Sequence, residues 1–213
     1  MARVIYKFGG TSVGDTRRLY RAARRIAAAH RAGDEVVAVL SAQAGATDAL
    51  LARGREIDPD CAGREADSLL STGEQVSVSL CALALARLGV PAVSLCGWQM
   101  GLQTDGSHGS ARVLGLRGDR IERELRAGRV VLAAFLHADL CRIYTDVDGV
   151  YDRDPRLHPD AVKYGRISYD DMLLLARGGA RVLHDRCVEL ARREHVMLEV
   201  CSAFSDAPGT IVG

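Results

Sequence analysis

Apolar residues recur along the chain with two different periods. Short apolar runs, rich in β-branched residues, are typical of the buried strands of a parallel sheet. Such runs predict strands at residues 3–8, 35–40, 90–95, 129–132, 142–145, 196–201 and 210–212. A weaker pattern indicates one more strand at residues 99–103. These runs together could form one sizeable sheet.

Helical periodicity separates these runs. Asp15 can cap a helix whose apolar residues between positions 19 and 27 fall on one face, and Gly33 ends it. The same spacing predicts further helices at residues 47–57, 64–70, 71–88, 120–126, 168–176 and 179–194. The stretch 71–88 is apolar nearly all round, which is typical of a buried central helix.

The alternation of strands and helices indicates an α/β protein. We predict a three-layer α/β/α sandwich with a mainly parallel central sheet. No internal repeat, linker or low-complexity stretch divides the 213 residues, a length that one large domain can take up. Residues 1–213 are therefore predicted to form a single domain.

The composition excludes several classes of protein. Hydrophobic residues make up 48% and charged residues 26%, which is ordinary for a globular domain and argues against disorder. A net charge of +1 gives no field that attracts nucleic acid or a membrane surface. The longest apolar run, residues 76–88, is too short to span a bilayer, and the N-terminus shows no secretory signal. We expect a cytoplasmic protein that binds neither nucleic acid nor membrane.

The basic residues are strongly biased towards arginine. Only Lys7 and Lys163 among the 28 basic residues are lysines. Lysine carries a compact point charge, whereas arginine carries a planar fork. A lysine kept in such a chain can therefore mark a site that needs an ammonium group. Lys7 stands beside glycines, while Lys163 can be explained by chance.

A first candidate site is the run KFGGTSVGDT at residues 7–16, at a predicted junction of strand and helix. Gly9 and Gly10 allow backbone N–H groups to approach an anion, and the helix N-terminus adds positive potential. The run is not a P-loop, because Asp15 stands where that motif requires lysine. An ordinary turn is the alternative, and Lys7 favours phosphate binding over it.

A second candidate, STGEQ at residues 71–75, has two interpretations. Ser71 and Glu74 have the spacing of a capping box, in which each side chain bonds the backbone N–H of the other. Spacing alone favours this cap. In the alternative, Glu74 presents its carboxylate to the ammonium group of a substrate.

A third candidate is the acidic run TDVDGVYDRDP at residues 145–155. It is not an EF-hand loop, because Val150 and Tyr151 stand where that loop needs an oxygen ligand and glycine. Loops at the carboxyl ends of strands are where open α/β sheets bind ligands. Solvated turn charges are the alternative. We predict that Lys7, Gly9 and Gly10 face the loop at residues 145–156 across one cleft, because both segments follow strand ends.

These runs belong to a series of segments that resembles aspartate kinase, of the amino acid kinase family. The segments, in order, are KFGGTSVG at 7–14, a SAxxxxTD-type stretch at 41–48, LLSTGEQVS at 69–77, GWQ at 97–99, TDGSHGSAR at 104–112, IYTDVDGVYDRDPR at 143–156, ISYDDM at 167–172 and GARVLH at 179–184. The resemblance implies transfer of the γ-phosphoryl group of MgATP to the β-carboxylate of L-aspartate. ATP and Mg²⁺ are then the cofactors, with no metal site built by protein side chains alone.

The resemblance also implies roles for individual residues. Lys7 would neutralise charge on the transferred phosphoryl group, and the amides of Gly9 and Gly10 would cradle phosphate oxygens. The residues that would hold aspartate are Ser41, Thr47 and Glu74, with Glu74 facing its ammonium group. The residues that would line the nucleotide site are Thr145, Asp146, Tyr151, Arg156 and Arg181. Positioning and charge neutralisation do most of the catalysis in phosphoryl transfer.

The sequence departs from aspartate kinases in two ways. Relatives continue into regulatory ACT domains, which we expect this chain to lack. After Leu132, relatives carry a core strand, a loop with the motif GRGGSD and the start of a helix, whereas this chain continues directly with AAFLHAD at 133–139. That motif supplies an arginine for the substrate α-carboxylate and an acid near the phosphates.

The gap leaves three interpretations open. Residues can be missing from the sequence as given, a true deletion can leave a degenerate kinase that binds nucleotide or a partner, or the site can be rebuilt for another acidic amino acid. For the chain as it stands we predict MgATP binding with weak or no aspartate phosphorylation. At the junction we expect either a broken link or a rebuilt connection with a short helix at 133–138. L-Aspartate and ATP are the expected partners, and a homo-oligomer is left open.

Overall fold

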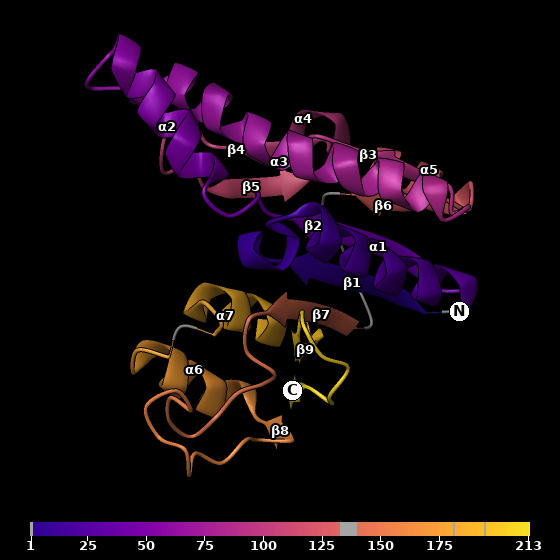
Figure 1. Ribbon diagram of the computed structural model, residues 1–213, viewed down its shortest axis with the longest axis vertical. Helices are drawn as coiled ribbons and strands as arrows, with labels where there is room; N and C mark the ends of the chain where they lie inside the picture. Colours follow the sequence, from indigo (N-terminus) through magenta and orange to yellow (C-terminus); the bar gives the residue numbers. More distant parts are fainter. Residues whose placement is uncertain (1, 133–139, 181, 194) are drawn as a thin grey trace.

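The framework of the molecule is one eight-stranded sheet with strand order β3-β6-β2-β1-β7-β9-β10-β8 (Figure 1). The structure is a computed structural model that describes residues 2–132, 140–180, 182–193 and 195–213. The strands of the sheet are β1 (Arg3–Phe8), β2 (Glu35–Leu40), β3 (Ala92–Ser94), β6 (Val130–Leu132), β7 (Leu140–Thr145), β8 (Arg166–Ile167), β9 (Met197–Ser202) and β10 (Thr210–Val212). Neighbouring strands run parallel except for the antiparallel pair of β9 and β10. The mainly parallel sheet that the sequence predicts is confirmed.

The remaining elements are helices and one hairpin. The helices are the short 3₁₀ helix η1 (Gly10–Val13), α1 (Thr16–Arg31), α2 (Ala46–Ile57), α3 (Gly63–Arg87), α4 (Gly97–Met100), α5 (Asp119–Arg126), α6 (Tyr169–Arg177) and α7 (Asp185–Arg193). The hairpin strands are β4 (Leu102–Thr104) and β5 (Val113–Leu116), which pair antiparallel. Helices thus follow strands through much of the chain, as the periodicity predicts.

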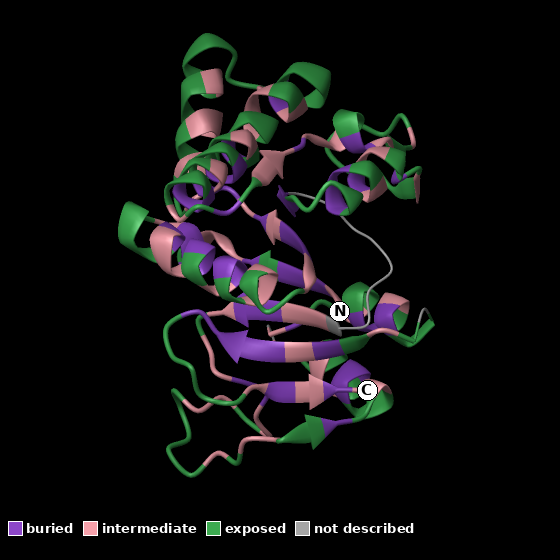
Figure 2. Ribbon diagram, turned by 90° about the vertical axis from the view of Figure 1, so that its right-hand side faces the viewer, coloured by how far each residue is buried: buried purple, intermediate pink, exposed green. Residues whose placement is uncertain are grey.

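Helices cover both faces of the sheet, which gives the three predicted layers (Figure 2). On one face, Tyr6 and Phe8 of β1 belong to a core shared with α1 and α3. Because successive strand residues point to opposite faces, Ile5 and Lys7 face the other side. There Ile5 packs in a core with α5, and Ile143 of β7 packs in a third core with α6 and α7. The central strands are buried between these layers.

One long helix, α3, replaces the two helices predicted at residues 64–70 and 71–88. It is 25 residues long and packs against α1, α2 and β3, with Cys81 and Leu85 fully buried. By length and composition alone it could cross a membrane, and among the described residues no other helix could. The apolar run at residues 76–88, which is too short to span a bilayer, makes up the second half of this helix and its C-cap. Burial of Cys81 and Leu85 shows that this helix supplies a core.

Local interactions explain the other differences. The strand predicted at residues 99–103 begins later, as β4 (Leu102–Thr104), because the Gln99 side chain accepts a hydrogen bond from the Cys96 N–H (2.9 Å) and closes the helical turn of α4. Helix α7 begins at Asp185, six residues later than predicted, where the His184 carbonyl accepts a hydrogen bond from the Cys187 N–H (2.9 Å). Strands β5 and β8 were not predicted. The expected junction and helix at 133–138 lie outside the described residues.

Candidate active site

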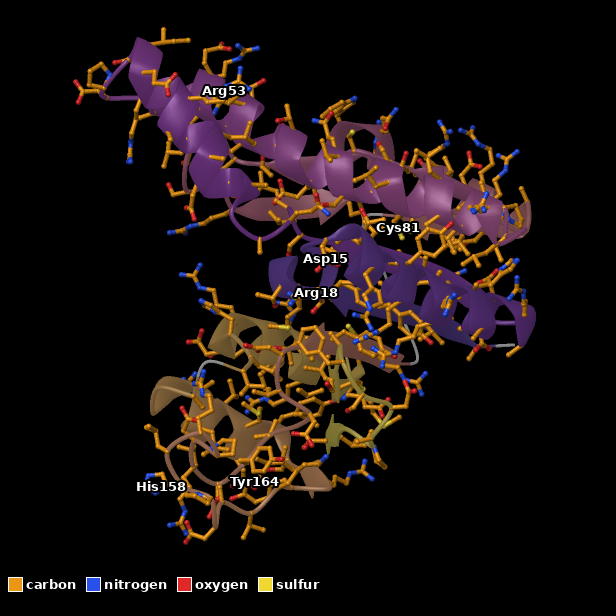
Figure 3. The ribbon with its side chains drawn as sticks, viewed as in Figure 1. Asp15, Arg18, Arg53, Cys81, His158 and Tyr164 are labelled. Atoms are coloured by element: carbon orange, nitrogen blue, oxygen red, sulfur yellow. The ribbon has the colours of Figure 1, made fainter. Side chains whose placement is uncertain are left out.

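Lys7 lies near the carboxyl end of β1, on the sheet face opposite α1. Its side chain is exposed, and among the described residues it has no ion-pair or hydrogen-bond partner. Its Nζ lies 3.9 Å from the position that a Cβ on Gly9 would occupy, so the ammonium group folds back over the glycine turn. The turn then leads into α1, whose first N–H groups include that of Arg18, which donates to the Asp15 carboxylate (2.8 Å) (Figure 3). An unpaired ammonium at this turn can meet an anion.

Close packing at Gly10 joins the turn to the segment after β2. A Cβ on Gly10 would lie 2.7 Å from the carbonyl oxygen of Ala42, too close for any residue but glycine. The Gly10 carbonyl accepts a hydrogen bond from the Ala44 N–H (3.2 Å), and the Ser41 N–H donates to the Phe8 carbonyl (3.0 Å). The predicted phosphate turn and the predicted substrate segment are therefore in direct contact.

Helix α3 brings Glu74 to the same place. Its Oε1 accepts a hydrogen bond from the Ala42 N–H (3.3 Å), and its side chain stays exposed. The capping box that spacing favoured is wrong, because Ser71 lies inside α3 and its hydroxyl donates to the Ser68 carbonyl (2.8 Å). Thr47 is the second residue of α2 and is exposed. The residues predicted to hold aspartate thus lie on or beside one segment, 41–47.

The end of β7 lies against the glycine turn. The Tyr144 carbonyl accepts hydrogen bonds from the Gly9 N–H (3.4 Å) and from the Ser12 hydroxyl (3.3 Å). Thr145 and Asp146 follow directly, with the Thr145 hydroxyl donating to the Asp146 carboxylate (2.9 Å). Lys7, the glycines and the start of the 145–156 loop are therefore at one edge of the sheet. Because the Gly9 N–H already has a partner, it is a weaker phosphate donor than the sequence suggested.

The rest of the loop is held by its own side chains. The Tyr151 hydroxyl donates to Asp148 Oδ1 (2.8 Å). Arg156 forms two hydrogen bonds with the Asp154 carboxylate (3.0 and 2.8 Å), and these lower the pKa of the Asp154 carboxyl to about 2. Arg156 is thus already paired, and a phosphate would have to displace Asp154. Arg181, the last predicted nucleotide residue, lies outside the described residues.

Three residues that received no individual role from the sequence hold this loop in place. They are Asp148, Lys163 and Thr210. Asp148 accepts from Lys163, while Lys163 and Thr210 also form hydrogen bonds to residues more than 40 positions away in the chain. The rarity of lysine was the one signal that pointed to Lys163. Nothing in the local sequence of Thr210 could have revealed its role, because its partners are more than 40 residues away.

The described residues contain no group of three or more His, Cys, Asp or Glu side chains able to hold a metal ion. Mg²⁺ commonly binds through substrate phosphates together with one or two carboxylates. Asp146 is exposed at the sheet edge and can serve as such a carboxylate. The site therefore suits magnesium that arrives bound to a nucleotide.

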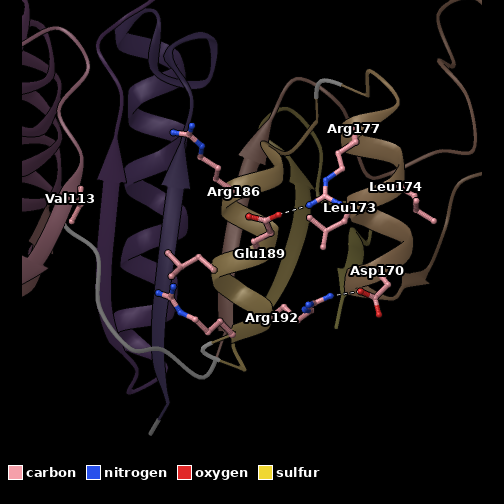
Figure 4. A pocket seen from close by; sticks show the side chains of 10 residues that line it. Val113, Asp170, Leu173, Leu174, Arg177, Arg186, Glu189 and Arg192 are labelled. Carbon is pink, nitrogen blue, oxygen red and sulfur yellow. Dashed lines mark hydrogen bonds and ion pairs between the residues drawn. The ribbon is translucent and has the colours of Figure 1, made fainter. Parts of the chain in front are cut away.

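A separate hollow of about 940 Å³ lies between α6 and α7, with Val113 of β5 at its border (Figure 4). Its charged groups are largely paired, Arg177 with Glu189 and Arg192 with Asp170. Of the residues predicted for catalysis or binding, none that the structure describes lines it. It is therefore distinct from the sheet-edge site.

Comparison with known proteins shows which family shares this arrangement. The model of the amino acid kinase family matches residues 2–134 and 130–202. Aspartate kinase from Pseudomonas putida is 40% identical over 240 aligned positions, which take in 100% of this chain and 58% of that protein. Aspartokinase from Mycolicibacterium smegmatis is 41% identical over 241 positions, 100% of this chain and 57% of that protein.

A solved structure agrees with the sequence matches. The crystal structure of aspartate kinase from Synechocystis superposes with a TM-score of 0.86 at 41% identity, covering 99% of this chain and 39% of that one. The chain thus spans well under two thirds of the length of these relatives. The alignments also run over more positions than the 213 residues of the chain, and the family match divides at residues 130–134. These matches confirm the resemblance drawn from the motifs.

Proposed function

The chain belongs to the amino acid kinase family, and on that premise we propose that it is an ATP-dependent phosphotransferase acting on the side-chain carboxylate of L-aspartate. The observation that carries the proposal is the position of Lys7. Its ammonium group has no partner among the described residues and lies over the glycine turn. The glycine turn also contacts both the 41–47 segment and the end of β7.

The nucleotide side of the site is formed by the glycine turn and the loop after β7. Lys7 neutralises the γ-phosphate, the amides around Gly10 face phosphate oxygens, and Asp146 meets the magnesium ion of MgATP. Tyr151 contacts the nucleotide further along the loop, together with Arg181 and with Arg156 after the nucleotide displaces Asp154 from it. Positioning and charge neutralisation of this kind supply most of the catalysis in phosphoryl transfer.

The acceptor side is formed by the 41–47 segment and α3. Ser41 and Thr47 offer hydroxyl groups, and the exposed carboxylate of Glu74 pairs with the substrate ammonium group. A carboxylate oxygen of aspartate attacks the γ-phosphorus, the bond from that phosphorus to the bridging oxygen breaks, and ADP leaves with the electron pair. The products are ADP and an acyl phosphate. The nucleophile is already an anion, so the step needs no general base.

A second candidate is a nucleotide-binding protein with little transfer activity. It is favoured by the division of the family match at residues 130–134 and by alignments longer than the chain. We infer that the segment absent there carries the GRGGSD motif, whose arginine would bind the substrate α-carboxylate. Losing one buried ionic contact costs about 2–5 kcal/mol, or roughly 1.5 to 3.5 orders of magnitude in affinity. Aspartate turnover should then be weak while MgATP binding persists.

The test compares binding with turnover on protein whose intact mass equals 22.9 kDa. Isothermal titration calorimetry measures MgATP affinity, and hydroxylamine trapping measures the acyl phosphate formed from aspartate. We expect MgATP to bind and acyl phosphate to form slowly. Lys7→Arg should lower the rate about 100-fold, because the larger planar fork cannot place its charge at the phosphoryl group. The affinity for MgATP should change far less.

Arg24→Met is the matched control, since it removes an exposed cation from α1 outside the predicted site. It should leave both rate and affinity unchanged. Small and equal effects of Lys7→Arg on the two quantities would support the second candidate. A protein that binds no MgATP would contradict both.

A further inference from the structure

Part of the loop after β7, residues 150–152, pairs with residues 162–164 through backbone hydrogen bonds. The Asp152 N–H donates to the Val162 carbonyl (3.1 Å), and the Tyr164 N–H donates to the Val150 carbonyl (2.9 Å). Tyr164 lies near the base of this paired region, and His158 lies at its outer end (Figure 3). This pairing places Lys163 opposite Tyr151.

The Lys163 side chain binds three acceptors at once. Its Nζ donates to the Asp148 carbonyl (3.0 Å), to Asp148 Oδ2 (3.2 Å) and to the Pro208 carbonyl (2.7 Å). Pro208 belongs to the segment between β9 and β10, about 60 residues beyond Asp148 in the chain. An ammonium group has three donors around one atom, whereas a guanidinium spreads its donors over a plane. Three converging acceptors therefore suit lysine and not arginine.

The Asp148 carboxylate connects Lys163 to Tyr151, because it accepts a hydrogen bond from each. The second oxygen of the Asp148 carboxylate, Oδ1, accepts the Tyr151 hydroxyl (2.8 Å). Burial raises the pKa of the Asp148 carboxyl, but the hydrogen bonds from Tyr151 and Lys163 outweigh it and keep that pKa below its ordinary value. The carboxylate is thus held charged between its two partners.

A second contact, made by Thr210, joins the same loop to the start of β10. The buried Thr210 hydroxyl accepts from the Val150 N–H (2.8 Å) and donates to the Tyr164 carbonyl (2.5 Å). A Cβ on Gly149 would lie 2.6 Å from that hydroxyl oxygen. The loop and the start of β10 are therefore packed as one unit, with Lys163 on its edge.

We propose that Lys163 is a positioning residue for the nucleotide loop, acting through Asp148 on Tyr151 and tying the loop to the Pro208 segment. The inference rests on the proposed function, because it takes Tyr151 as a nucleotide contact. Lys163 itself touches no nucleotide. Its role explains why a chain that uses arginine almost everywhere keeps lysine at this position.

The test measures MgATP affinity by calorimetry for the whole chain and five variants, one of which is Tyr151→Phe alone. Lys163→Met keeps the length of the side chain but removes its donors, and we expect it to weaken MgATP binding about 10-fold. Lys163→Arg should not restore affinity. In a Tyr151→Phe background, Lys163→Met should weaken MgATP binding less than about 3-fold, because the Tyr151 hydroxyl through which Lys163 acts is already absent. Arg177→Met, which breaks an ion pair between α6 and α7, is the control and should bind as the wild type does.

Hydrogen exchange of residues 146–152 without nucleotide provides an independent measurement. Exchange should be faster in Lys163→Met than in the wild type or in Arg177→Met. Unchanged exchange, or wild-type affinity in Lys163→Met, would overturn the role of Lys163 and leave the proposed function standing. An equal loss of affinity in both Tyr151 backgrounds would overturn the route through Asp148. Failure of the wild type itself to bind MgATP would overturn the proposed function and this role with it.

Discussion

The absence of a Cβ atom at Gly10 allows the segments after β1 and β2 to pack together. The missing side chain of Gly10 lets the turn after β1 touch the Ala42 carbonyl, and Glu74 then reaches the N–H of the same residue. The contact joins elements that follow β1 and β2 and a helix that starts more than 20 residues later. Gly10 is therefore needed for packing as well as for any approach of its amide to phosphate.

Gly10→Ala tests this packing. The added methyl group would lie 2.7 Å from a backbone oxygen and would force the two segments apart. Overpacking of this kind costs about 1–3 kcal/mol of unfolding free energy, measurable by urea denaturation. Gly106→Ala is the control, because its Cβ would meet nothing within 4 Å, and it should be close to neutral. A Gly10→Ala protein as stable as the Gly106→Ala protein would show that the segments can separate without cost.

Helix starts show how a motif depends on its place in an element. Asp15 and Ser71 both have the side chains that helix caps use. Asp15 precedes α1, and its carboxylate accepts the Arg18 N–H (2.8 Å). Ser71 lies near the middle of α3, where each backbone N–H already has an intrahelical partner. Only the first of the two can act as a cap.

Alanine substitutions separate the two cases. Asp15→Ala should lower the unfolding free energy by about 1 kcal/mol, since one helix N–H loses its acceptor. Ser71→Ala should change it by less than about 0.5 kcal/mol, as an exposed position inside a helix does. Thermal unfolding followed by circular dichroism measures both. Equal losses would mean that a helix begins at Ser71 in solution.

The molecule as a whole depends on α3 as a core element. One side of this helix packs against α1 and the sheet, and the other carries apolar residues that reach solvent. Leu85 is 0% exposed, whereas Leu83, two residues away, is 68% exposed. The same helix therefore contains a matched pair of leucines in opposite environments.

Leu85→Ala should reduce the unfolding free energy by about 2–5 kcal/mol, because it removes buried methyl groups and leaves a cavity. Leu83→Ala should cost less than about 0.5 kcal/mol. Urea denaturation of the two variants in aqueous buffer makes the comparison. If Leu83→Ala were the more damaging change, α3 would bury the face that carries Leu83 and not the face that carries Leu85.

Local sequence was enough to predict much of the fold. Apolar runs located β1, β2, β6 and β9, and the cap at Asp15 located the start of α1, because these signals act over a few neighbouring residues. Alternation of such elements then led to a three-layer sandwich with a mainly parallel sheet. The motifs also pointed to Lys7, Gly9, Thr145 and Asp146, since parallel strands bring their carboxyl ends to one edge.

Tertiary structure decided the rest. The STGEQ run lies inside a helix because residues 63–70 are also part of α3. The local sequence is compatible with a helix that starts at either Gly63 or Ser71. The Lys163 side chain is held by hydrogen bonds to Asp148 and Pro208, and the Thr210 hydroxyl is held by the Val150 N–H. Contacts between residues so far apart leave no periodic trace in the sequence. They exist because the sheet sets the distance between strand ends, and the side chains then complete the hydrogen bonds that this distance allows.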